Sequence, residues 1–269
     1  AEFVSAVWLT PQMDRLFIDG AAGRRRFLDR LVFAFDAAHS GRVNGYEHTL
    51  RERARLLREG AADPVWLDTL EGKMAERGVA IAAARREMTA RLAQLCAHET
   101  GPFPGAEVNV EGTVERWLDD GPALQAEERF RSALRDGRGR DAAAGGAAAG
   151  PHRSDLCVRH LAKDMPAEQC STGEQKALLI ALVLAHARLL EAERGTAPLL
   201  LLDEVTAHLD RERREALFDA IISLGMQAWF TGTDRTLFES LDGRAQFCTV
   251  ADGTVEQEPA VTVRRTGTE

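Results

Sequence analysis

The sequence feature that most constrains the fold is a run of four leucines closed by two adjacent carboxylates, at residues 199–204. An uninterrupted aliphatic run is typical of a strand buried on both faces of a parallel sheet. Side chains at the carboxyl ends of such strands line the crevice where ligands bind. Asp203 is therefore a candidate Mg²⁺ ligand, and Glu204 a candidate for orienting or deprotonating a water aimed at a nucleotide phosphate. Taken alone, the run is equally typical of a buried strand followed by an acidic loop.

A predicted helix start lies upstream, where the polar residues 170–176 precede the apolar run 177–185. Ser171 is a natural N-cap, Glu174 stands at the capping-box position, and Gly173 lets the backbone approach a ligand closely. A helix N-terminus presents free N–H groups and the positive end of the helix dipole, so it suits an anion such as a γ-phosphate. A capping box alone is common, and by itself indicates only a well-capped helix.

The chain downstream of the two acids reads as a turn, a helix and a second strand. Apolar side chains repeat at helical spacing from Arg211 to about Leu224. Residues 227–234 then read as a strand that ends in polar side chains. The order of capped helix, acid-tipped strand, helix and polar-tipped strand is more specific than any one of these elements.

This ordered set of motifs resembles the C-terminal part of an ABC-type ATPase head, and specifically the RecF family of bacterial recombination mediators. The similar segments are residues 171–176 (signature motif), 199–204 (Walker B strand), 207–210 (D-loop), 231–234 (switch), 8–17, 23–29 and 150–156. The last three segments separate the RecF family from transporter ATPases. The resemblance therefore covers nearly the whole chain.

The resemblance implies an α/β fold, in which an ABC-type ATPase head (lobe I) carries an inserted, mostly helical second lobe (lobe II). It assigns residues 1–36 and 150–269 to the head and residues 37–149 to the helical arm. Hydrophobic periodicity agrees with this organisation and outlines the elements. We predict helices from Gly23 and over 46–59, 65–99 and 123–135, strands at 107–111 and 156–160, a flexible loop at 137–150, and a hairpin at 246–257 that turns at Asp252-Gly253.

In ABC-type heads, two subunits sandwich ATP between the P-loop and Walker B strand of one and the signature motif of the other. By resemblance, Ser171 and Gly173 contact the γ-phosphate in trans, Asp203 belongs to the Mg²⁺ shell, and Glu204 is the base or water-orienting group. The other nucleotide-binding residues that the resemblance implies are Gln175, Asp210, Thr233 and Asp234. Thr233 or Asp234 stands where transporter relatives often place a histidine, which leaves the γ-phosphate sensor open.

One part of such a head is missing from the sequence. A P-loop requires Gly-x-x-x-x-Gly-Lys-[Ser/Thr], because its amides and lysine cradle the phosphates. The chain has three lysines, Lys73, Lys163 and Lys176, and none lies in this pattern. RecF-like proteins carry the P-loop and the first head strands near the N-terminus. We therefore expect a C-terminal fragment whose nucleotide chemistry depends on a P-loop outside it.

The RecF resemblance implies an ATP-dependent clamp, in which ATP binding closes a homodimer on DNA and hydrolysis releases it. RecF-like proteins are expected to recognise gapped DNA with RecR and RecO and to help load RecA. The formal net charge of −8 does not favour binding to duplex phosphates. Charge is uneven, however, and the cluster Arg24, Arg25 and Arg26 has few acids nearby. These three arginines are our candidate DNA contacts.

Two alternatives stay open. The first is a head of another ATPase of the structural-maintenance-of-chromosomes class, which the short arm and the 8–29 and 150–156 motifs disfavour. The second is a non-enzymatic module, because a chain without a P-loop could serve only as a dimerisation or partner-binding surface.

The cysteines, histidines and apolar runs indicate which further sites and which cellular compartment to expect. The four cysteines show no close spacing and the seven histidines no ligand pattern, so neither a zinc site nor a disulfide framework is indicated. We expect Cys170 to have a packing role, because no general base is placed beside it. No apolar run is long enough to span a membrane and no signal peptide opens the chain. We therefore expect a cytoplasmic protein with no membrane partner.

Overall fold

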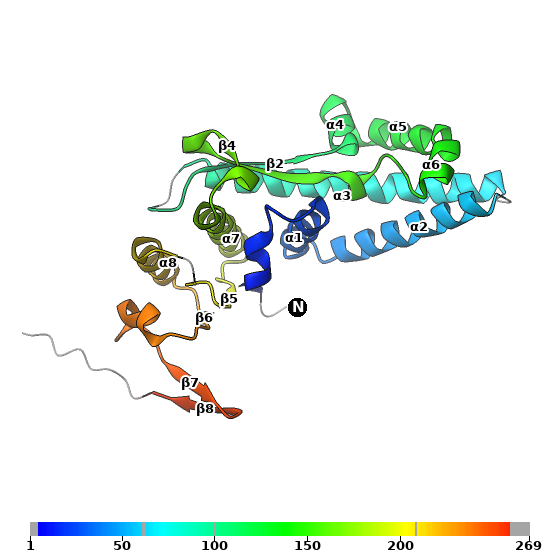
Figure 1. The fold of residues 1–269 in the computed structure, drawn as a ribbon. Helices are drawn as coiled ribbons and strands as arrows, with labels where there is room; N and C mark the ends of the chain where they lie inside the picture. Colours follow the sequence, from blue (N-terminus) through cyan, green and yellow to red (C-terminus); the bar gives the residue numbers. More distant parts are fainter. Residues whose placement is uncertain (1–4, 61–62, 99–100, 208, 259–269) are drawn as a thin grey trace, which may run out of the picture.

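The structure, a computed structural model, describes residues 5–60, 63–98, 101–207 and 209–258. These residues form a mixed α/β head from which a long helical arm extends (Figure 1). The helices are α1 (Ala21–Phe33), α2 (His39–Glu59), α3 (Pro64–Cys96), α4 (Thr113–Asp120), α5 (Ala123–Asp136), α6 (Arg138–Ala144), α7 (Thr172–Arg194) and α8 (Arg211–Ser223). The strands are β1 (Ala6–Leu9), β2 (Ala106–Glu111), β3 (Asp155–His160), β4 (Met165–Pro166), β5 (Leu199–Leu202), β6 (Ala228–Phe230), β7 (Cys248–Ala251) and β8 (Thr254–Gln257).

The predicted acid-tipped strand is the centre of a parallel sheet with the order β1-β5-β6. Leu200 and Leu202 are buried in a large core together with apolar residues of α7 and α8. Among the described residues, none covers the opposite face of the sheet, which corrects the expectation of a strand buried on both faces. A row of aligned side chains is exposed there: Trp8 by 39%, Leu201 by 39% and Trp229 by 59%. The four-leucine run thus belongs to a one-sided strand.

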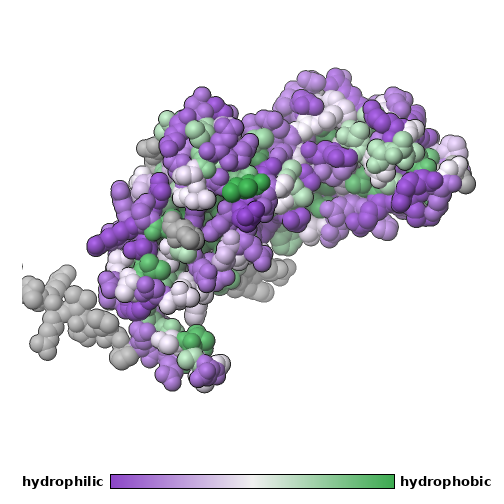
Figure 2. Space-filling model, in the orientation of Figure 1, coloured by the Kyte–Doolittle hydropathy of each residue, from purple (hydrophilic) through white to green (hydrophobic). Residues whose placement is uncertain are grey.

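A second, antiparallel sheet has the order β2-β3-β4, and a two-stranded hairpin is formed by β7 and β8. The strand predicted at 156–160 therefore joins β2 and not the parallel sheet. The hairpin turns at Asp252 and Gly253, both at positive φ, as predicted for an Asp-Gly turn. Both hairpin strands are exposed, and hydrophobic side chains are visible on the hairpin below the head (Figure 2).

The arm is built on α3, which runs unbroken beside α2 (Figure 1). The helix continues through Gly72 and Gly78, although glycine has a low helix propensity. A side chain at Gly78 would lie 2.6 Å from the ring of Phe130 and 3.3 Å from Pro151. Gly78 therefore allows the close approach of α5 to α3. The burial of Phe130 compensates for the low helix propensity of this glycine.

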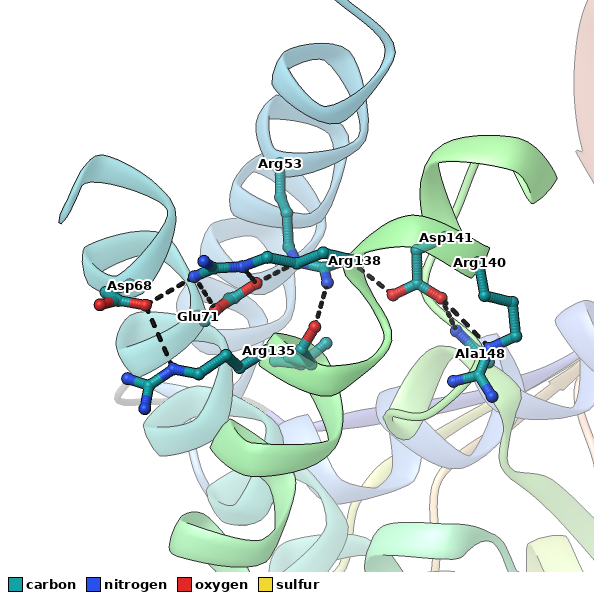
Figure 3. A network of polar contacts seen from close by, with 9 residues as sticks. Arg53, Asp68, Glu71, Arg135, Arg138, Arg140, Asp141 and Ala148 are labelled. Carbon is teal, nitrogen blue, oxygen red and sulfur yellow. Dashed lines mark hydrogen bonds and ion pairs between the residues drawn. The ribbon is translucent and has the colours of Figure 1, made fainter. Parts of the chain in front are cut away.

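The predicted flexible loop at 137–150 is also wrong, because the segment contains α6 and is fixed by buried charges. Arg53 on α2 bridges two carboxylates, with Nε 2.9 Å from Glu71 Oε1 and Nη1 2.9 Å from Asp141 Oδ2 (Figure 3). Arg138 binds the other oxygen of Glu71 at 2.6 Å, and Asp141 also accepts from the amide of Ala148 at 3.2 Å. Alanine and glycine composition therefore did not reveal that the segment is anchored by its few polar residues.

A second polar cluster joins the arm to the head. Asp29 on α1 accepts two hydrogen bonds from Arg85 on α3, both at 2.8 Å, and its Oδ1 lies 2.8 Å from Nε2 of His39 on α2. Arg85 also donates to the carbonyl of Pro151 at 2.6 Å. Three helices thus meet at one carboxylate, and Arg85 links the 150–156 motif to the same cluster.

Among the helices of the described residues, none combines the length and the apolar character needed to cross a bilayer. The division of the chain at residues 36/37 and 149/150 stays a prediction. The C-terminal part of α3 and strand β2 contribute buried side chains to the large core of the head, including Met88, Leu92 and Val108.

Arg53→Met should destabilise the arm strongly, because the buried carboxylates of Asp141 and Glu71 would lose the guanidinium with which both are paired. Breaking a buried ion pair costs about 3–5 kcal/mol. Arg55→Met is the matched control, since Arg55 forms an exposed pair with Glu59 one helical turn away, and such a pair contributes less than about 0.5 kcal/mol. Denaturant unfolding of the three proteins measures the difference. Equal losses for both variants would contradict a structural role for the buried network.

Candidate functional site

The candidate site begins at the carboxyl ends of β5 and β6. Asp203 and Glu204 follow β5 and are both exposed. The hydroxyl of Thr231, directly after β6, donates to Asp203 Oδ1 at 2.5 Å and accepts from the amide of Glu204 at 3.0 Å. Thr231 therefore fixes both acidic residues, a role that we did not assign to it from sequence. Its position as the first polar residue after a neighbouring parallel strand was the available signal.

Glu204 has a positive φ of 48°, in the left-handed region that residues with a side chain rarely adopt. The Thr231 hydrogen bond and the buried residues Val205 and Thr206 hold the backbone in this turn. The turn leaves the Glu204 carboxylate exposed at the edge of the sheet. Strained residues of this kind occur preferentially at functional sites.

The donor set at this edge fits Mg²⁺. Asp203 offers carboxylate oxygens and Thr231 a hydroxyl oxygen, which are ligands that a hard cation prefers. Within the described residues, no group of three or more His, Cys, Asp or Glu side chains is arranged to hold a metal.

The start of α7 has the predicted capping box. Ser171 is the N-cap, and Glu174 accepts from its amide at 3.0 Å and from its hydroxyl at 2.9 Å. Lys163, in the short 3₁₀ turn Leu161–Lys163, forms an ion pair with the same carboxylate. The pKa of Glu174 is lowered to about 2, first by Lys163 and then by the two hydrogen bonds from Ser171. In this structure the Ser171 donors are therefore directed to Glu174.

Gly173 and Asp210 are brought close together by an arginine. Asp210 caps α8 by accepting from the amide of Arg213 at 2.8 Å. A side-chain carbon at Gly173 would lie 3.6 Å from Nη1 of Arg213, and the same nitrogen is 3.4 Å from Asp210 Oδ2. The first turns of α7 and α8 are therefore neighbours, which the sequence spacing could not establish. His208, within the predicted D-loop, lies outside the described residues.

Of the other predicted nucleotide contacts, one is buried and two are exposed. Gln175 is buried, and its Nε2 donates to the carbonyl of Cys170 at 2.9 Å. Cys170 itself is buried, as expected for a packing residue. Asp234 is exposed and caps the 3₁₀ helix Arg235–Leu241, accepting from the amide and hydroxyl of Thr236. Thr233 is exposed in the preceding turn. The assignments of Gln175, Thr233 and Asp234 as nucleotide contacts stay predictions.

Two of the three arginines predicted to contact DNA already bind other groups of the protein. Arg24 donates to both oxygens of Asp155 at 2.7 Å and to three backbone carbonyls, and these bonds join α1 to β3. Arg25 donates to the carbonyl of Ser154 at 2.8 Å. Arg26 is exposed. The sequence cluster thus divides into two arginines with structural contacts and one that faces solvent, and DNA binding by any of them stays a prediction.

Lys163→Met should raise the pKa of Glu174 toward the ordinary glutamate value, because the largest cause of its depression is removed. The direction of the pH dependence follows from linkage. A carboxylate whose pKa is lower in the folded state than in the unfolded state stabilises the fold above its unfolded pKa, and this stabilisation is lost as the pH falls through the folded pKa. The ¹³C shift of the Glu174 carboxyl should be flat down to about pH 4 in the parent and should titrate there in the variant. Lys73→Met is the control. Identical titration in all three proteins would contradict the ion pair.

The chain is similar to known proteins over almost its whole length, although no protein-family model matches it. It is 56% identical over 256 residues to the DNA replication and repair protein RecF of Mesorhizobium japonicum (strain LMG 29417 / CECT 9101 / MAFF 303099), covering 94% of this chain and 68% of the relative. For RecF of Brucella abortus (strain 2308), the identity is 53% over 254 residues, 94% of this chain and 66% of the relative. The chain thus spans about two thirds of the length of these relatives.

Solved structures agree on the fold. The structure of the recombination mediator protein RecF-ATPrS in the RecFOR pathway superimposes with a TM-score of 0.79 at 21% identity, covering 95% of this chain and 68% of that one. The corresponding RecF-ATP structure gives a TM-score of 0.77. The α/β architecture is that of the RecF ATPase head, as predicted. Identity and coverage together show that the chain belongs to the RecF family of DNA replication and repair proteins.

Proposed function

We propose that this chain forms the nucleotide-responsive, dimer-forming part of a RecF-type ATP-dependent DNA clamp. The observation that carries the proposal is the exposure of two polar tips on buried elements. Ser171 opens α7, and Asp203 and Glu204 close β5, while most of α7 and one face of β5 lie in the core. Polar tips that emerge from an apolar helix and strand are available to a ligand or a second copy without disturbing the fold.

The acidic tip is the half of the site that acts within one copy. Asp203, oriented by Thr231, would bind Mg²⁺ and so neutralise phosphate charge. Glu204 would accept a hydrogen bond from the attacking water, orienting it or taking its proton. The backbone of Glu204 is fixed by the Thr231 hydroxyl, which supports a defined direction for the carboxylate.

The start of α7 is the half that acts across the dimer. Ser171 and Gly173 would receive the γ-phosphate bound to the other copy, at a helix end whose dipole favours an anion. The Ser171 hydroxyl donates to Glu174 at 2.9 Å, so contact with a phosphate oxygen would require it to change partner. Asp210 lies beside this helix start through Arg213, which supports a shared surface for the signature motif and the D-loop.

The P-loop would complete the site from outside the 269 residues. The exposed row Trp8, Leu201 and Trp229 is an apolar surface next to the acidic tip, and β6 has no strand on its other side among the described residues. A strand and helix that carry the P-loop could pair with β6 and cover this row. An alternative proposal is that these 269 residues form a non-enzymatic dimerisation or partner-binding module. The lack of a P-loop lysine among them favours this alternative.

The proposed partners follow from the relatives. The relatives carry the name DNA replication and repair protein, and the solved structures belong to the RecFOR pathway. We propose that the closed homodimer binds gapped DNA, acts with RecR and RecO, and assists RecA loading. Arg26 on α1 is the exposed member of the candidate DNA-binding cluster.

Glu204→Gln should abolish ATP hydrolysis while leaving nucleotide binding intact, because the amide cannot accept a proton. We expect a fall of about 100-fold or more in turnover. The assay uses this chain fused behind the segment of the Mesorhizobium japonicum relative that lies outside the matched region, where we expect the P-loop. This protein is called the P-loop fusion below. Glu212→Gln, at an exposed position of α8, is the control. Unchanged turnover with Glu204→Gln would remove the catalytic assignment.

Ser171→Arg should block ATP-driven dimerisation of the P-loop fusion, since a long cationic side chain would fill the space meant for the other copy's γ-phosphate. Nucleotide binding by the monomer should be retained. Sedimentation velocity with and without ATP measures the effect, with Ser223→Arg on exposed α8 surface as the control. Normal ATP-dependent dimers of Ser171→Arg would count against the role across the interface.

A further inference from the structure

Lys176 is almost completely buried, with a relative exposure of 3%. It lies on α7, five residues after the N-cap Ser171. Its Nζ donates to Asp14 Oδ2 at 3.1 Å and to the backbone carbonyl of Ala207 at 2.7 Å. One ammonium group therefore joins three segments that are distant in sequence: the start of α7, the turn after β5 and the 3₁₀ helix Pro11–Arg15 that follows β1.

A buried lysine needs a specific reason. Lysine is seldom fully buried unless paired, because removing an ammonium group from water is costly. The Lys176 ammonium has one charged acceptor, Asp14, and one neutral acceptor, the Ala207 carbonyl. An apolar side chain would fill the same space without that cost. The contacts themselves are therefore what a lysine provides at this position.

The carbonyl that Lys176 holds belongs to the segment that leads to Asp210. Ala207 is the first residue of the D-loop segment 207–210, and Asp210 caps α8. At the other end of the segment, Arg213 lies against Gly173 and near Asp210. The start of α7 is thus bonded to this segment through Lys176 at its beginning and lies close to Arg213 at its end.

We propose that Lys176 is a positioning residue for dimer closure. It holds the α7 start and Ala207 in one fixed arrangement, so that Ser171, Gly173 and Asp210 meet the second copy together. Asp14 extends the link to the end of β1, and hence to the parallel sheet that bears the acidic tip. The inference rests on the proposed function, since it assigns a role within the same ATP-dependent interface.

The test separates positioning from stability with three variants of the P-loop fusion. Lys176→Met removes both contacts, Asp14→Asn removes the charge partner but leaves the Ala207 contact, and the double variant leaves no unpaired charge. The control is Lys73→Met, on an exposed position of α3. We expect Lys176→Met to weaken ATP-dependent dimerisation about tenfold or more while monomer affinity for ATP stays within about twofold. The double variant should regain thermal stability but not dimerisation.

A second readout uses the 269-residue chain without nucleotide. Amide hydrogen exchange at Leu209 and Asp210 should accelerate in Lys176→Met, because the segment loses its hydrogen bond from the Lys176 ammonium, whereas exchange in α2 and α3 should not change. Dimerisation that equals the control, or that recovers with stability in the double variant, would overturn the positioning role. Unchanged exchange at 209–210 would overturn it as well. If the unmutated fusion fails to dimerise with ATP, the proposed function fails, and the exchange experiment still decides whether Lys176 holds the segment.

Discussion

The head is organised by the need to cover α7, a helix that is apolar around most of its circumference. Such a helix is stable only when neighbours surround it. Side chains from β1, α1, the end of α3, β2, β3, β5 and α8 share one core with it. The second sheet, the arm helix and the parallel sheet are thereby fixed relative to one another. The polar first turn of α7 is the part that emerges, which is why its chemistry is available at the surface.

The arm differs from the head because several buried charged side chains contribute to its interior. Its apolar core is small and centres on Tyr46, Met74 and Phe130, with charged side chains buried nearby. Arg53 and Glu71 are both almost inaccessible to solvent. Buried ion pairs contribute little net stability compared with apolar packing, yet they cost much when one partner is removed. They therefore specify how α2, α3 and α6 meet more than they strengthen the contact.

The sequence was sufficient where local chemistry decides the structure. The capping box at Ser171, the parallel strand 199–202 and the Asp-Gly hairpin turn were all predicted, and the RecF resemblance gave the fold. It was insufficient where tertiary contacts decide. The exposure of Leu201 depends on what covers the sheet, the order in 137–150 depends on Asp141, and Gly78 is tolerated because of Phe130. Thr231 and Lys176 were missed as site residues because their partners are distant in sequence.

The central claim is that Ser171 of one copy and Glu204 of the other serve the same nucleotide. Mixing the P-loop fusions that carry Ser171→Arg and Glu204→Gln tests it most directly. In a twofold-symmetric dimer, a mixed pair carries both substitutions in one composite site and leaves the other site intact, so the mixture should hydrolyse ATP faster than either variant alone. A mixture as inactive as either variant alone would contradict the shared site.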